Sequence, residues 1–230
     1  MKTSNIIIIA FAAFIISGML FLFIDAKKHK KEVENNISFK EFPLATFSVI
    51  VAEKGSDLHI DWSDSTVVKV EYLKDKKTPS KIYEVVNDTL RVYGGLRTFV
   101  KCKKIATIIG NKPFWVGVNN FTPDSLTIRM NGGSLYYDKD RGNKDEKLDQ
   151  KTFNLGIIAN DSAYVEINNN KLHNLSVMSD NAKVRNNCNV NIANIRLLDG
   201  AKFSTIDRID ILLVKKDISC QVGISYQDSY

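Results

Sequence analysis

Hydrophobic and polar positions alternate along most of the chain after about residue 47, which is typical of β-strands with one buried face. Short runs such as FSVIV, DLHID, TVVKVEYL and DTLRVY are rich in valine, isoleucine and tyrosine, and turn-forming clusters separate them. No later segment has the helical periodicity of an amphipathic helix. The pattern predicts an all-β domain over residues 45–230, with an irregular β start over residues 45–125.

The C-terminal part contains a repeat with a step of 19 residues. The segments DSAYV, DNAKV, DGAKF and ISCQV each place a small residue and, two positions later, an apolar residue. One such coil cannot bury its apolar edge alone, whereas stacked coils share a core and pair their backbones with the neighbouring coils. The repeat therefore predicts a β-solenoid with regular coils over residues 153–226. Its predicted core positions are Ala163, Val165, Ala182, Val184, Ala201, Phe203, Cys220 and Val222.

An aspartate occupies the same position in three of the coils, namely Asp161, Asp180 and Asp199. One interpretation is a surface ladder of carboxylates that binds Ca²⁺ or a sugar. The other is a column of turn residues that bond their own backbone. The second is favoured because no second acidic column accompanies the first. The charged insertion over residues 137–151, which has almost no apolar residues, is interpreted as a solvated loop.

Aromatic residues gather in the segment FWVGV (114–118), with Phe121, and in SLYY (134–137). Exposed tyrosine and tryptophan side chains often anchor ligands or partners. The favoured alternative is that these residues cover the end of the solenoid, where the first coil otherwise exposes its core.

The first 25 residues have a different character. Residues 6–24 carry no charge over 19 positions, and a helix of that length spans about 28 Å, close to the hydrocarbon core of a bilayer. The run is longer than that of a cleaved signal peptide, and no small-x-small cleavage site follows it. The sequence predicts a transmembrane anchor over 1–25 and a juxtamembrane basic linker over 26–44. Binding to membrane lipid is expected through residues 6–24 and through Lys27, Lys28, Lys30 and Lys31.

The orientation of this anchor has two interpretations. The lysines on its C-terminal flank favour a cytoplasmic domain by the positive-inside rule. A short N-terminal tail ahead of a long C-terminal domain favours a signal anchor that exports the domain. The expected location is a single-pass membrane protein with a periplasmic or extracytoplasmic domain.

The net charge of +6 is concentrated at the N-terminus. Residues 1–31 hold five of the 32 basic and one of the 26 acidic residues, so the remainder has a net charge of only +2. Nucleic-acid binding is not expected, because it requires a basic patch on the domain itself. The three cysteines and three histidines show no metal-ligand spacing, and no catalytic motif is present. No catalytic residue, cofactor or metal ligand is predicted.

The segments ATFSVIVAEKGSDLHIDWSD and VVNDTLRVYG, together with the D-x-A-K-V coils, resemble the autotransporter adhesin head GIN domain family of Bacteroidetes-type bacteria. The resemblance covers roughly residues 45–228 and implies a right-handed parallel β-helix with an irregular β start, on the extracytoplasmic side. Together with the hydrophobic pattern, the predicted fold class is all-β, a right-handed parallel β-helix (β-solenoid) preceded by an N-terminal transmembrane helix. The resemblance implies no established activity and no catalytic residues. The chain departs from the family in its charged insertion and lacks the glycine usual in the first strand pair.

Three functions remain as hypotheses. The favoured one is a non-enzymatic, membrane-anchored envelope protein whose β-solenoid serves adhesion, binding or scaffolding, with a protein or glycan partner or self-association. The second is a carbohydrate-active enzyme on a β-helix scaffold, with paired carboxylates in a groove. The third is a cytoplasmic, membrane-tethered β-solenoid that polymerises through an unpaired edge near Val222.

Overall fold

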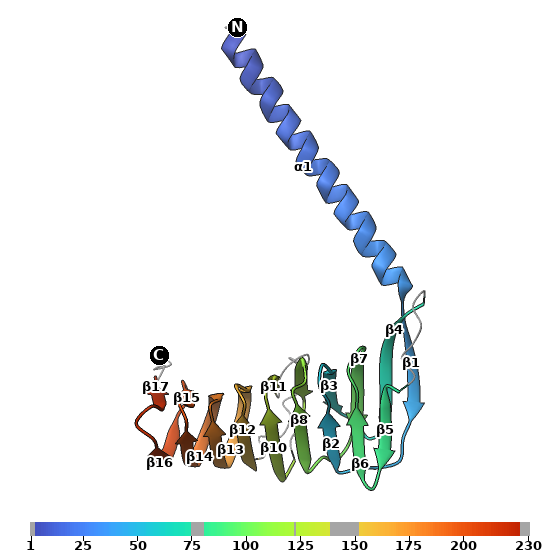
Figure 1. The fold of residues 1–230 in the computed structure, drawn as a ribbon. Coiled ribbons are helices and arrows are strands. Elements are labelled where there is room, and N and C mark those ends of the chain that lie inside the picture. Colours follow the sequence, from blue (N-terminus) through green and yellow to red (C-terminus); the bar gives the residue numbers. More distant parts are fainter. Residues whose placement is uncertain (1–2, 75–80, 122, 139–151, 226–230) are drawn as a thin grey trace. The chain divides into compact units, whose positions relative to one another are not determined.

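The computed structural model describes residues 3–74, 81–121, 123–138 and 152–225, which form one helix and 17 strands (Figure 1). The chain divides into two compact units. The first consists of Met1–Phe39 with Tyr72–Thr78, and the second of Lys40–Glu71 with Pro79–Tyr230.

The helix α1 spans Thr3–Asn36 and continues through part of the segment predicted as a linker. Lysine and glutamate dominate that segment, and both have good helix propensity. The prediction of a transmembrane helix is wrong, since none of the described helical residues forms a stretch long and apolar enough to cross a bilayer. The boundaries at residues 25 and 44 stay predictions.

Two strands, β13 and β14, are 17 and 16 residues long, and the others have four to eight residues. The strands are β1 (Ile37–Pro43), β2 (Val49–Ala52), β3 (Asp57–Trp62), β4 (Val67–Leu73), β5 (Tyr83–Val86), β6 (Thr89–Val92), β7 (Arg97–Cys102), β8 (Thr107–Asn111), β9 (Trp115–Asn119), β10 (Ser125–Asn131), β11 (Ser134–Asp138), β12 (Phe153–Asn160), β13 (Tyr164–Asp180), β14 (Lys183–Leu198), β15 (Lys202–Thr205), β16 (Ile209–Lys216) and β17 (Gln221–Ile224).

Parallel pairing organises the second unit into two series of neighbouring strands (Figure 1). The β2 series has the order β6, β2, β8, β10 and β12. The β3 series has the order β7, β3, β9 and β11. Both series continue into β13 and β14, which are 17 and 16 residues long and join them into one sheet. Beyond β14, the first series continues in β16 and the second in β15 and β17.

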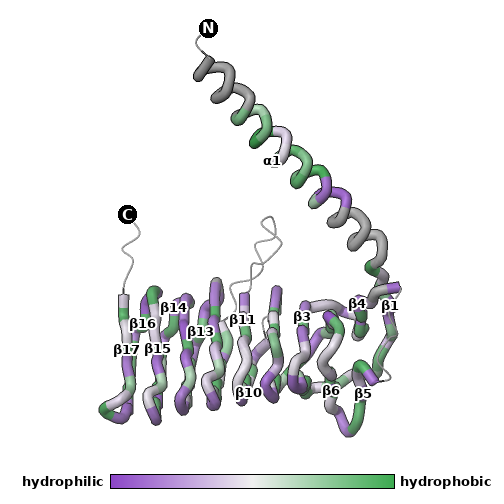
Figure 2. Tube along the Cα trace, turned by 45° about the horizontal axis from the view of Figure 1, so that its top comes forward, coloured by the Kyte–Doolittle hydropathy of each residue, from purple (hydrophilic) through white to green (hydrophobic). Residues whose placement is uncertain are grey.

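Hydrophobic and hydrophilic positions both occur along the strands (Figure 2). Their alternation places apolar side chains of both series in one buried cluster. In the β2 series, one inward column consists of register partners that are all 3% exposed or less, except at its end, where Val214 is 41% exposed. Burying each such side chain contributes about 1.5–3 kcal/mol. The members of this column are Ile50, Ile108, Ile128, Ile157, Val177, Ile195 and Val214.

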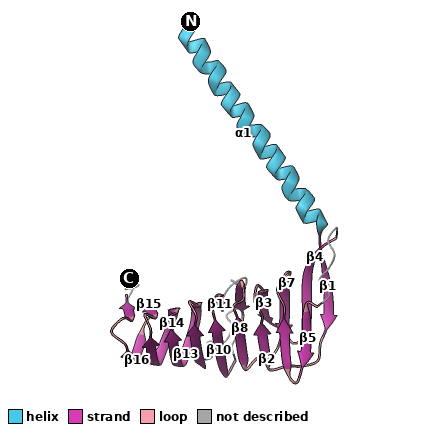
Figure 3. Cartoon of the chain, in the orientation of Figure 1, coloured by secondary structure: helices cyan, strands magenta, loops and turns pink. Residues whose placement is uncertain are grey.

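The all-β prediction for the domain is confirmed (Figure 3). The prediction of a right-handed parallel β-helix, or β-solenoid, is wrong. The strands form one open sheet of mixed pairing, in which β4 pairs with β7, and β5 with β6, in the antiparallel direction. A repeat specifies which residues of neighbouring strands face each other, but it does not specify that the sheet closes on itself. The positive φ of Asn87 and Asp88 also builds a two-residue hairpin between β5 and β6 that lies outside the repeat.

The predicted core positions lie in two sets near the C-terminal strands. Val165, Val184, Phe203 and Val222 are successive register partners in β13, β14, β15 and β17. The small residues lie at the preceding turns, where the carbonyls of Ala163, Ala182 and Ala201 accept hydrogen bonds of 2.8, 2.9 and 3.1 Å from Lys183, Lys202 and Gln221. Cys220 takes the corresponding place before β17. All of these side chains are 3% exposed or less, except the half-buried Val222.

The charged insertion predicted over 137–151 lies outside the described residues from position 139 onward. Its first two residues, Tyr137 and Asp138, are the end of β11. Tyr137 is fully buried, and its hydroxyl donates a hydrogen bond to the carbonyl of Phe121.

Candidate functional site

Five partly exposed ring side chains form a continuous row across the outward face of the β3 series and β13. Successive ring centroids lie 4.8, 4.5, 5.9 and 5.7 Å apart. Each ring comes from a different strand, and the strands are neighbours in the sheet. We call this set the aromatic row; its members are Phe99 (β7), His59 (β3), Trp115 (β9), Tyr136 (β11) and Tyr164 (β13).

Strand alternation turns these rings outward. His59 lies between Leu58 and Ile60, both fully buried, so its ring must point to the opposite face. Tyr136 is placed in the same way between the fully buried Leu135 and Tyr137.

A glycine keeps the row unbroken in β9. Gly117 is the register partner of both His59 and Tyr136, so the row has no side chain of its own at that position. The ring of Trp115 fills the gap, since a Cβ placed on Gly117 would lie 2.1 Å from the ring's Cη2 atom. The indole therefore lies over the Gly117 backbone, in contact with the rings on both sides.

The rings touch but do not fully cover one another. The planes of Phe99 and His59 are 22° apart, whereas those of His59 and Trp115 are 47° apart. Tyr136 and Tyr164 are tilted by 55°. The planes of Trp115 and Tyr136 are 26° apart, so two of the four pairs are stacked and two are tilted. Each ring–ring contact contributes roughly 0.5–1.5 kcal/mol.

A hydrogen-bonded network lies beside Tyr164. Its hydroxyl donates to Oε2 of Glu166 at 2.5 Å, and Nδ2 of Asn187 donates to Oε1 of Glu166 at 3.3 Å. The same amide donates to Oδ1 of Asn168 at 2.6 Å, and Nε of Arg185 donates to Oδ1 of Asn187 at 3.3 Å. Burial, followed by the hydrogen bond to Glu166, raises the pKa of Tyr164 to about 12. Tyr164 therefore stays a hydrogen-bond donor at neutral pH.

Two carboxylates and one guanidinium lie beside the other end of the row. Nε of Arg97 is 3.2 Å from Oδ2 of Asp57, and its Nη1 is 3.6 Å from Oε2 of Glu71. The other oxygen of Asp57 is 3.3 Å from Nε2 of His59. These pairs are partly exposed, and pairs of this kind contribute roughly 0–1 kcal/mol each.

A basic groove continues the row beyond Tyr164. Lys183, Lys202 and Gln221 are the successive register partners of Tyr164 in β14, β15 and β17. Together with Arg185 they line an open groove of about 470 Å³. Among the described residues, neither Lys183 nor Lys202 has an ion-pair partner. We call the groove around Lys183, Arg185 and Lys202 the basic groove.

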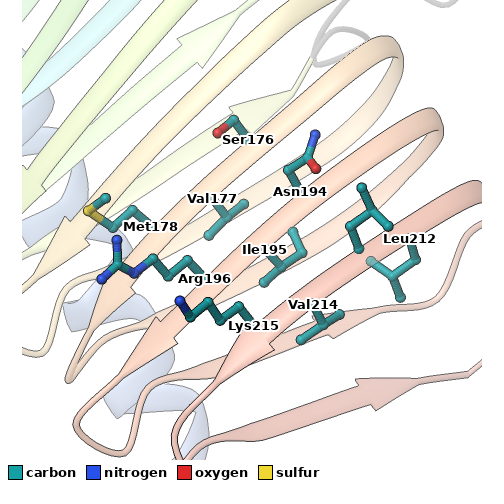
Figure 4. Close-up of a pocket in the computed structure, with 10 residues that line it drawn as sticks. Ser176, Val177, Met178, Asn194, Ile195, Arg196, Leu212, Val214 and Lys215 are labelled. Carbon is teal, nitrogen blue, oxygen red and sulfur yellow. The ribbon is translucent and has the colours of Figure 1, made fainter.

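A second open groove, of about 530 Å³, lies where β13, β14 and β16 meet (Figure 4). Met178, Arg196 and Lys215 are register partners and lie together at one end of it. Ser176 and Asn194 lie at the other end (Figure 4). This groove has cationic and aliphatic lining residues but no aromatic ring or carboxylate among the described residues. It therefore offers fewer kinds of contact than the aromatic row with its basic groove.

The prediction that the aromatic segments cover one end of the domain is wrong. Trp115 and Tyr136 lie on β9 and β11, each of which has a paired strand on both sides. Phe121 and Tyr137 belong to the core, at 1% and 0% exposure. Phe114 is 75% exposed and lies outside the row.

The predicted aspartate positions lie at turns. Asp161 and Asp199 have positive φ angles of 54° and 47°, and Asp180 is the last residue of β13. Aspartate tolerates this backbone conformation, as its short side chain bonds locally. In the part of the chain that the structure describes, no group of three or more His, Cys, Asp or Glu side chains is arranged to hold a metal ion.

Sequence comparison gives no family model and no curated protein that matches this chain. Among solved structures, a candidate adhesin of Bacteroides fragilis is similar with a TM-score of 0.54 and 9% identity, over 82% of this chain and 96% of that one. Two Parabacteroides distasonis proteins, a candidate adhesin and a candidate lipid-binding protein, have TM-scores of 0.43 and 0.41. Both are 12% identical and cover the same shares of the two chains. The chain thus shares its fold with the Bacteroides protein, while membership of the head GIN family stays a prediction.

Proposed function

We propose that this protein is a non-enzymatic, adhesin-like binding module of the cell envelope that holds an extended glycan on its aromatic row. The observation that carries this proposal is the unbroken contact of five partly exposed rings across five neighbouring strands. The fold shared with a candidate adhesin of Bacteroides fragilis supports it.

The row suits the chemistry of a sugar chain. Each sugar ring has an apolar face of C–H groups and a rim of hydroxyls. Aromatic side chains contact the apolar face, and adjacent polar groups bind the hydroxyls. Neighbouring strands lie about 4.8 Å apart, which is close to the length of one sugar unit in an extended glycan. Successive units therefore meet successive strands, and the network around Tyr164 and Glu166 supplies both donors and acceptors.

The interactions of the carboxylates near the aromatic row favour a binding role over hydrolysis. Glycoside hydrolysis requires one carboxyl group as an acid and a second as a base or nucleophile. Asp57 and Glu71 are both partners of Arg97, and Glu166 accepts hydrogen bonds from Tyr164 and Asn187. Each of these carboxylates already takes part in the protein's own interactions.

The test is to replace Trp115 and Tyr136 by alanine, singly and together, and to titrate the purified full chain with linear oligosaccharides in a calorimeter. Each substitution is expected to weaken binding by roughly 1–2 kcal/mol, or about 5- to 30-fold, because central aromatic contacts dominate such interfaces. Phe114→Ala, which removes an exposed ring outside the row, is the matched control and should leave binding unchanged.

Two results contradict the proposal. One is a wild-type chain that binds none of the glycans, and the other is binding that survives the double substitution. A bound oligosaccharide should also be recovered intact, so the release of new reducing ends refutes the non-enzymatic part.

A further inference from the structure

We infer that the ligand of the aromatic row is an anionic glycan, a linear polysaccharide with carboxylate or sulfate groups on some of its units, and that its charged units lie in the basic groove. This inference rests on the proposed function and names the ligand class of the same site.

The strand register places the basic groove next to the last ring of the aromatic row. Tyr164, Lys183 and Lys202 are successive partners on three adjacent strands. The register partner of Tyr136 is Glu166, so a chain that follows the row shifts by two residues along the strands to reach Tyr164. From Tyr164 it passes to two ammonium groups along one register column. Gln221 extends the same column on β17.

The two lysines of the basic groove have no ion-pair partner among the described residues, whereas Arg185 has Glu166 as its register partner. Lys183, Arg185 and Lys202 contribute three positive charges, and no carboxylate is among the described residues that line the groove. Lys183 and Lys202 face each other directly in the register of β14 and β15. Like charges placed opposite each other on neighbouring strands destabilise a sheet. An anion bound between them relieves this repulsion, so the groove binds negative charge more favourably than isolated surface lysines do.

The distribution of charge along the row favours a glycan over a nucleic acid. The far end of the row carries Asp57 and Glu71 beside Arg97, so a ligand with a negative charge on every unit meets carboxylates there. The centroid separations of 4.5–5.9 Å also leave no space for a base to insert between two rings. A glycan that is charged on only some of its units can place a charged unit over the lysines and a neutral unit beside Asp57 and Glu71.

The experiment compares an anionic and a neutral oligosaccharide of equal length, with hyaluronan fragments as the first probe and cello-oligosaccharides as the second. The wild-type chain should bind the anionic probe about tenfold more tightly at low salt, and the difference should shrink at high salt because ions screen exposed charges. The paired substitution Lys183→Gln with Lys202→Gln should remove this preference. The pair Lys54→Gln with Lys104→Gln lowers the net charge equally at exposed positions outside the groove, and should retain the preference.

Several outcomes overturn the inference. The first is equal affinity of the wild type for the two probes, and the second is a preference for the anionic probe that survives the Lys183 and Lys202 substitutions. The third is an equal loss of that preference in the Lys54 and Lys104 control pair. The fourth is stronger binding of a single-stranded oligonucleotide than of the anionic probe. If Trp115→Ala weakens binding of both probes but the lysine pair changes nothing, the proposed function stands and this inference fails. If Trp115→Ala changes binding of neither probe, the proposed function itself fails. Thermal unfolding of each variant shows that it is folded.

Discussion

At the scale of single residues, Tyr164 connects the two chemistries of the site. Its ring is the last of the aromatic row and contacts Tyr136, and its hydroxyl donates a hydrogen bond to Glu166 in the polar network. The next register partner is Lys183, the first cation of the basic groove. A single tyrosine thus adjoins apolar, hydrogen-bonding and charged contacts.

The titration of Tyr164 gives the first residue-level prediction. Burial and the Glu166 carboxylate raise its pKa from 10.0 to about 12, so folding favours the protonated phenol. The resulting stabilisation is fully present below about pH 10 and is lost as the pH rises from about 10 to about 12. Phenolate absorbance of the wild type minus that of Tyr164→Phe should show a midpoint near the upper value. A midpoint at the ordinary tyrosine pKa contradicts the network.

At the scale of elements, β9 shows how a strand shapes the site without supplying a side chain at every position. The absence of a Cβ at Gly117 lets the Trp115 ring lie flat between His59 and Tyr136. The glycine is therefore required for close approach, and its φ angle plays no part.

Gly117→Ala is expected to displace the Trp115 ring, because the new Cβ would lie 2.1 Å from it. Overpacking of this kind costs typically 1–3 kcal/mol, and the row should lose its continuity. The measurements are urea unfolding, tryptophan fluorescence and glycan titration. The control is Gly156→Ala in β12, where the nearest atom lies 3.8 Å from the added Cβ. Equal behaviour of the two variants refutes the role of Gly117.

Sequence patterns predicted the strands of this sheet better than its site. The step of 19 residues in the sequence equals the register step from Val165 to Val184 and on to Phe203, because each repeat of the sequence pairs with the next one in the same register. The repeat carries no information about closure, and it has no counterpart in the hairpin of β5 and β6. It was on this point that the β-solenoid prediction failed.

The aromatic row could not be predicted from the sequence, for a different reason. His59 and Phe99 lie 40 positions apart in sequence, and only strand pairing makes them neighbours. Alternation does mark both as outward residues, so the available signal was an aromatic ring at an outward position in several strands. Trp115 and Tyr136 were noticed in the sequence but assigned to covering the end of the domain.

At the scale of the whole molecule, the second unit has one continuous core, and its cysteines report on it. Cys102, Cys188 and Cys220 are free thiols with 1–3% exposure, and they come from distant parts of the sheet. Burial raises the pKa of Cys102 and of Cys188 to about 12. The reactivity of each thiol therefore reports whether a different part of the fold is intact.

None of the three cysteines should react with iodoacetamide in the native chain at about pH 8, where thiols with the ordinary pKa of about 8.5 react readily. All three should react in guanidinium chloride, and mass spectrometry of tryptic peptides distinguishes the sites. Rapid labelling of Cys188 in the native chain shows that the core around β14 is open.

The exposure of Val214 has a consequence for how the molecule behaves at high concentration. Every earlier member of its column is shielded by the next strand, whereas Val214 is accessible to water on a strand that ends in Lys215 and Lys216. Lysines on such a strand discourage stacking between molecules, because two copies would bring their ammonium groups together. Colloidal stability of this protein therefore rests on electrostatic repulsion at one end, and it should fall when those two charges are neutralised by acetylation or masked by concentrated salt.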